Sequence, residues 1–60
     1  MAIEDDIREL VKTAKVQLRE MEKGIIVLEE AGEDVTTRRE AYELLKRRID
    51  GLEAGLKKIT

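Results

Sequence analysis

The 60-residue sequence contains no cysteine, histidine, proline, phenylalanine or tryptophan. Without cysteine there is no disulfide, and without cysteine and histidine the common ligand sets for zinc, haem and iron–sulfur clusters are missing. Chains this short usually need a disulfide, a metal or a partner chain, because one small core supplies only about 3–5 kcal/mol. Because a disulfide and the common metal sites are excluded, the composition indicates that a partner chain stabilises the fold.

The side chains used in covalent catalysis are also scarce, since serine is absent and the hydroxyl groups belong to threonines and Tyr42. Every carboxylate falls on an exposed face of an expected helix or in the expected turn, where burial cannot tune it for acid–base work. We therefore expect no enzyme, no metal and no cofactor. The acidic residues near the midpoint are interpreted as a solvated turn rather than a cation site; they are Glu29, Glu30, Glu33 and Asp34.

Charge of one sign and long apolar runs are lacking too. Twelve basic and fourteen acidic residues give a net charge of −2, which is typical of neither a basic nucleic-acid binder nor an acidic tail. The longest apolar run, Ile25–Leu28, is too short to cross a membrane, so no membrane partner is expected. Glu4, Asp5 and Asp6 follow Met1 closely, which does not fit a secretory signal, and the default expectation is a cytoplasmic protein.

What the sequence does contain is a coiled-coil pattern, with 43% charged and 42% apolar residues. Apolar residues recur at alternating steps of four and three in two runs, which predicts helices over about 3–31 and 36–59 and a turn at about 32–35. One step of the second run is occupied by Arg38. The seam residues are Ile7, Val11, Ala14, Leu18, Met21, Ile25, Leu28, Val35, Tyr42, Leu45, Ile49, Leu52, Leu56 and Ile59.

The turn carries its own signals. Gly32 suits a left-handed position just past the end of a helix. The second helix begins either after a cap at Asp34 or with a capping box over 37–40.

Folding the chain back at Gly32 brings the two seams into register. Leu18 then faces Leu45, Ala14 faces Ile49, and the position numbers of each facing pair have the same sum along the whole length. The sequence therefore predicts an all-α fold, an antiparallel two-helix hairpin that forms a single unit over 1–60. We expect it to dimerise into a four-helix bundle, because one hairpin leaves much apolar surface wet.

The expected oligomer interface is a row of residues beside the seam on each helix. Three mid-helix glycines lie in it, each costing about 0.5–1 kcal/mol relative to alanine, and close approach of another helix would explain them. Gln17 and Arg48 lie near its middle, where a polar residue can fix register; a surface position at the edge of the bundle is the alternative. The row comprises Ile3, Leu10, Gln17, Gly24, Ala41, Leu44, Arg48, Gly51 and Gly55.

Two further surfaces each allow a functional interpretation and an ordinary one. Val16, Ile26 and Val27 point away from the seam, as a contact for a heterologous protein partner or as ordinary surface. A basic stripe follows one side of the first helix and offers a grip on phosphates, although such a stripe is commonly just a solvated face. The stripe comprises Arg8, Lys12, Lys15, Arg19 and Lys23.

The layout of two long helices around a short acidic turn is similar to that of the plasmid copy-number regulators of the Rop family. The resemblance implies an antiparallel four-helix-bundle dimer that binds paired RNA loops, and it covers the helix–turn–helix plan without a shared residue motif. The leading expectation is a small interaction module that self-associates, acting as an adaptor, a regulator or inhibitor, or an assembly subunit. A Rop-like nucleic-acid-binding regulator that uses the basic stripe is the alternative.

Overall fold

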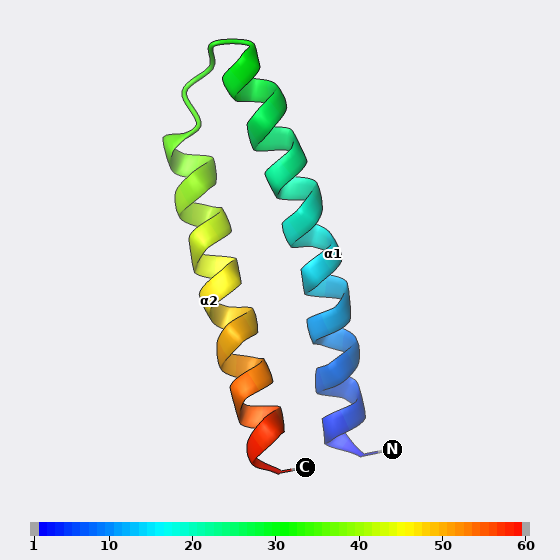
Figure 1. The fold of residues 1–60 in the computed structure, drawn as a ribbon. Coiled ribbons are helices and arrows are strands. Elements are labelled where there is room, and N and C mark those ends of the chain that lie inside the picture. Colours follow the sequence, from blue (N-terminus) through cyan, green and yellow to red (C-terminus); the bar gives the residue numbers. More distant parts are fainter. Residues whose placement is uncertain (1, 60) are drawn as a thin grey trace.

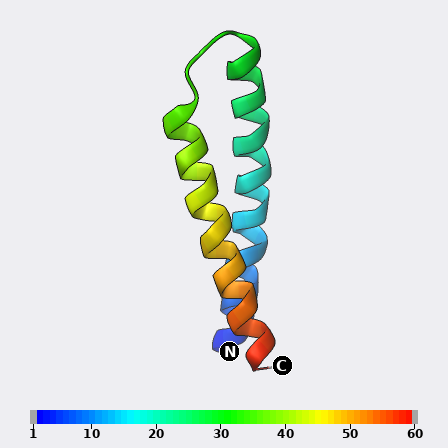
Figure 2. The same cartoon turned by 60° about the vertical axis from the view of Figure 1, so that its left-hand side comes forward.

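Two antiparallel helices joined by one turn make up the protein in a computed structural model that describes residues 2–59 (Figure 1). Helix α1 spans Ile3–Glu30 and helix α2 spans Thr36–Lys58, with no strand in the described part of the chain. The helices lie side by side in both views, and the start of α1 and the end of α2 both lie at the end of the hairpin opposite the turn (Figures 1 and 2). The molecule measures 45 × 16 × 12 Å. The expected all-α hairpin is confirmed.

Helix α1 ends in a glycine-dependent cap. Gly32 has a φ of +80°, the left-handed conformation that the sequence predicted for it. The Glu33 N–H donates to the Leu28 carbonyl at 2.9 Å, and the Gly32 N–H donates to the Glu29 carbonyl at 3.0 Å. This pair of hydrogen bonds is the Schellman motif, which satisfies carbonyls that the end of the helix would leave unpaired.

Helix α2 begins beside Asp34. The Asp34 Oδ1 accepts hydrogen bonds from the Thr36 backbone N–H at 3.0 Å and from the Thr36 hydroxyl at 2.7 Å. These two bonds, the hydroxyl bond first, hold the pKa of Asp34 below its ordinary value of 3.8. The alternative start, a capping box over 37–40, does not serve as the helix end, because those residues already lie inside α2.

The core lies along the seam between the helices. Val11, Ala14 and Ile49 form its buried centre, and Ile49 is only 3% exposed. Partly buried side chains pack around this centre, namely Ile7, Leu18, Leu45, Leu52 and Leu56. Towards the turn the seam continues with buried Ile25 and Val35. The alternation of four and three thus places one apolar stripe of each helix against the other.

One expected seam residue is wrong. Ile59 is 61% exposed, so it does not belong to the packed seam. It follows the end of α2 at Lys58, and the register that pairs Ile7 with Leu56 sets Glu4 opposite it. A carboxylate gives the isoleucine no apolar surface to cover it.

Neither helix has the combination of length and apolar character that crossing a membrane requires, as judged over residues 2–59.

Candidate functional site

The seam has two sides, and the sequence fills them differently. The side we call the charged flank consists of Arg8, Lys15, Glu22 and Glu29 on α1 and Arg39, Lys46 and Glu53 on α2. The side we call the open flank is the expected oligomer interface: Ile3, Leu10, Gln17 and Gly24 on α1 and Ala41, Leu44, Arg48, Gly51 and Gly55 on α2. In an antiparallel pair, each side of one helix faces the same side of the other, so each flank is built from both helices.

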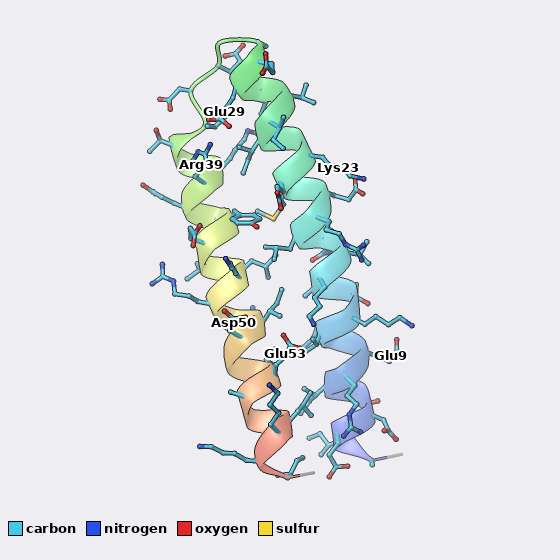
Figure 3. The ribbon with its side chains drawn as sticks, in the orientation of Figure 1. Glu9, Lys23, Glu29, Arg39, Asp50 and Glu53 are labelled. Atoms are coloured by element: carbon cyan, nitrogen blue, oxygen red, sulfur yellow. The ribbon has the colours of Figure 1, made fainter. Side chains whose placement is uncertain are left out.

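Ion pairs between the helices close the charged flank. The Lys15 Nζ lies 2.8 Å from the Glu53 Oε2, and the Arg39 Nη2 lies 2.5 Å from the Glu29 Oε2. Figure 3 shows Glu29 and Arg39 reaching toward each other near the turn, with Glu53 between the helices farther down. The hydrogen bond and then the charge of Glu29 raise the pKa of Arg39, so this guanidinium stays protonated.

The same flank has a polar contact midway between these two ion pairs. Glu22 lies two turns of α1 from Glu29 and accepts a hydrogen bond from the Tyr42 hydroxyl at 3.3 Å. The half-buried Tyr42 ring therefore belongs to the seam while its hydroxyl reaches the edge. Lys46 on α2 shares the heptad position of Arg39 and faces Glu22 in the register of the ion pairs, so opposite charges face each other at three successive levels.

Sequence reasoning missed the charged flank as a unit. The signal was present, because the position numbers of Lys15 and Glu53 have the same sum as those of Glu29 and Arg39. A test of facing charges beside the seam would have found it.

The open flank has no comparable closure. Leu10 is 51% exposed and Leu44 is 67% exposed, and the remaining members are exposed as well. Within residues 2–59, the side chains of Gln17 and Arg48 have no hydrogen-bond or ion-pair partner. A Cβ built on Gly24, Gly51 or Gly55 would meet nothing within 4 Å, so the hairpin itself does not use the space these glycines leave.

Three hollows open on the open flank. One of about 610 Å³ lies on α2 and is lined by Ala41, Leu44, Leu45, Arg47 and Arg48. The hollow nearer the turn, of about 380 Å³, lies between Gly24 and Ala41 and reaches the seam at Met21 and Ile25, with Glu20 and Arg38 at its rim. The hollow nearer the chain ends, of about 130 Å³, is lined by Leu10, Ala14, Gln17, Leu45, Arg48, Ile49 and Leu52. On the charged flank, by contrast, the hollows are bordered by the ion-paired Glu29, Arg39 and Glu53.

The basic stripe is partly neutralised by neighbouring carboxylates. Arg8 lies 3.5 Å from Asp5, Lys15 pairs with Glu53, and Lys23 lies 3.6 Å from Glu20. Lys12 and Arg19 have no ion-pair partner among residues 2–59. The stripe therefore offers two free cations, on one face of α1 and two turns apart.

The outer apolar residues Val16, Ile26 and Val27 are all exposed, as the sequence suggested. Ile26 lines the hollow between Glu29 and Tyr42 on the charged side. Val16 and Val27 line none of the hollows described above. These three residues do not share one hollow.

The acidic residues of the turn form no metal site in the described part of the chain, where no group of three or more carboxylates is arranged to hold an ion. Glu29 is engaged by Arg39 and Asp34 by Thr36.

The fold and its two flanks define an all-α antiparallel helical hairpin. No protein-family model matches the chain, and no curated protein or solved structure is found to be similar to it.

Proposed function

We propose that this protein is a non-enzymatic interaction module that acts as a homodimer, with the open flanks of two hairpins packed together as a four-helix bundle. The supporting observation is the difference between the flanks. One flank is closed by ion pairs within the chain, while the other exposes Leu10 and Leu44 beside glycines and three hollows. Exposed apolar surface of this kind marks contact sites.

The size of the exposed area of the hairpin also supports the proposed dimer. Its accessible surface is 4968 Å². A compact monomer of 6.9 kDa is expected to expose about 4,000 Å². The excess of roughly 1,000 Å² is similar to the ~800 Å² that each partner buries in a standard interface. A second copy on the open flank would therefore bring the exposed area per chain close to that of a compact protein.

Sedimentation equilibrium at micromolar concentration tests the proposal, with circular dichroism to establish that the chain is helical in the same samples. We expect twice the chain mass of 6.9 kDa, falling toward the chain mass on dilution. A cooperatively folded species that keeps the monomer mass at high concentration would contradict self-association.

A second candidate function, binding of structured RNA, has one observation in its favour. Lys12 and Arg19 are exposed and have no carboxylate partner among the described residues, and a dimer would present two such pairs. The double variant Lys12→Glu with Arg19→Glu should then abolish salt-dependent binding to a structured RNA. The matched control is Lys46→Glu on α2, which should leave binding in place; absence of binding by the parent chain removes this candidate.

A further inference from the structure

Resting on the proposed homodimer, we infer how the second copy is oriented. The twofold axis crosses the hairpin at the level of Gln17 and Arg48, perpendicular to the helices. It places α1 against α1 and α2 against α2 of the second copy, each pair antiparallel. The inference rests on the order of large, small and polar residues along the open flank, and on the positions of two of its three hollows.

Three levels of the open flank are spaced by one heptad, about 10 Å at 1.5 Å per residue. The middle level holds the polar pair Gln17 and Arg48. The level nearer the chain ends holds Leu10 and Gly55, and the level nearer the turn holds only the small residues Gly24 and Ala41. Along α1 the flank is thus bulky toward the chain ends and small toward the turn, whereas along α2 the large Leu44 lies toward the turn and Gly51 and Gly55 lie toward the chain ends.

A twofold axis through the middle level exchanges the two outer levels. Leu10 of one copy then lies over Gly24 of the second copy, and Ile3 lies over Ala31 by the same register. On α2, Leu44 lies over Gly51. Each large apolar side chain therefore meets a small residue, and because the interface is isologous each contact occurs twice.

Two of the three hollows of the open flank lie where this arrangement places Leu10 and Leu44 of the second copy. Leu10 of the second copy reaches the hollow between Gly24 and Ala41, and Leu44 of the second copy reaches the hollow that opens on Ala14 and Leu52. The absence of any atom within 4 Å of a Cβ at Gly24 or Gly51 leaves these side chains room to enter. Leucines seated over glycines in this way give the interdigitation that protein cores require.

The other symmetric arrangement packs less evenly. An axis parallel to the helices would set α1 over α2 of the second copy and keep each level beside its own equivalent. Leu10 would then lie over Gly55 and Gly24 over Ala41 of the second copy, but Leu44 would lie near the level of Glu20 and Met21 and would meet no small residue.

The polar pair at the centre would fix the register. Gln17 and Arg48 line the same hollow, and the twofold axis brings them next to their own copies. A slip of one heptad would place Gln17 against Leu10 and leave a polar group without a partner. The exposed Arg48 guanidinium can reach the edge of the bundle while its stem covers apolar surface.

Cysteine cross-linking tests the orientation, since the native chain has no cysteine. Single variants Leu10→Cys, Gly24→Cys and Gly55→Cys are mixed in pairs and treated with a short bismaleimide. We expect the pair Leu10→Cys with Gly24→Cys to give at least ten times more cross-linked dimer than Leu10→Cys with Gly55→Cys. Leu10→Cys alone should cross-link poorly, because its two copies lie about 21 Å apart along the axis. Preferential linking to Gly55→Cys would overturn the inference.

A label outside the interface gives an independent distance. A nitroxide on Asp6→Cys, near the chain ends and exposed, should report a separation of at least about 33 Å between copies, from 22 residues of axial offset. A separation below about 20 Å would mean that α1 packs on α2 of the second copy, and would overturn the orientation while leaving the dimer. A monomer in sedimentation would remove the proposed function itself, so the two failures are distinguishable.

Discussion

The two flanks of the seam have the same heptad spacing and opposite character. The charged flank is completed within one chain, since Lys15 meets Glu53 and Glu29 meets Arg39 across the helices. The open flank presents Leu10 and Leu44 with no covering element in the described residues. One side of this short hairpin therefore specifies the pairing of its own helices, and the other side is the surface that we propose a second copy covers.

Their energetic roles differ as well. Exposed ion pairs contribute only about 0.2–1 kcal/mol each, so the charged flank selects the antiparallel register more than it stabilises the fold. A buried leucine contributes about 1.5–3 kcal/mol. In the proposed dimer, covering the open flank would therefore stabilise the protein more than the ion pairs of the charged flank do.

The largest effect is expected from a charge on the open flank. Leu10→Asp removes the burial of two leucines per dimer, about 3–6 kcal/mol, and should raise the dimer dissociation constant roughly 10²- to 10⁴-fold in sedimentation equilibrium. Val16→Asp is the matched control, because Val16 is similarly exposed but lies outside the open flank. Equal weakening by both variants would contradict the assignment of the interface.

The next effect concerns the seam that both flanks share. Ile49→Ala should lower the free energy of unfolding by about 2–5 kcal/mol, because this side chain is 3% exposed at the centre of the core. Urea unfolding at fixed protein concentration measures the change. Ile59→Ala, which alters an exposed isoleucine, should stay within about 0.5 kcal/mol of the parent, and a comparable loss there would restore Ile59 to the seam.

A smaller effect is expected on the charged flank. Glu53→Lys replaces an attraction to Lys15 by a repulsion and should cost about 0.2–1 kcal/mol. Adding Lys15→Glu should restore most of the loss, with the coupling read from a double-mutant cycle in urea and weakened by salt. Additive effects of the two changes would show that the ion pair does not contribute.

The smallest effect is a pH dependence at the start of α2. The folded pKa of Asp34 lies below the ordinary value of 3.8, so its contribution is present above that value and is lost as the pH falls through the lower folded pKa. The midpoint temperature of thermal unfolding should therefore fall less between pH 5 and pH 2 in Asp34→Asn than in the parent. An unchanged acid limb in that variant would exclude a role for the Asp34 carboxylate.

Much of the hairpin was readable from the sequence because its determinants are local and periodic. The apolar spacing predicted two facing helices, and Gly32 predicted the left-handed end of α1. The exposure of Ile59 and the charged flank could not be predicted in this way, because both depend on which residues of the two helices face each other. Ile59 follows the spacing but lies beyond the end of α2 opposite a carboxylate, and the charged flank becomes visible only when charges of both helices are compared across the seam. The partial neutralisation of the basic stripe by Asp5, Glu20 and Glu53 has the same cause.

Methyl NMR with a soluble paramagnetic probe shows directly whether a second copy covers the open flank. The methyl groups of Leu10 and Leu44 are compared with those of Val16 over a dilution series, because all three side chains are exposed in the hairpin. We expect Leu10 and Leu44 to be protected from the probe at high protein concentration and to become accessible on dilution, while Val16 stays accessible throughout. Accessibility of all three at every concentration would contradict the proposed interface.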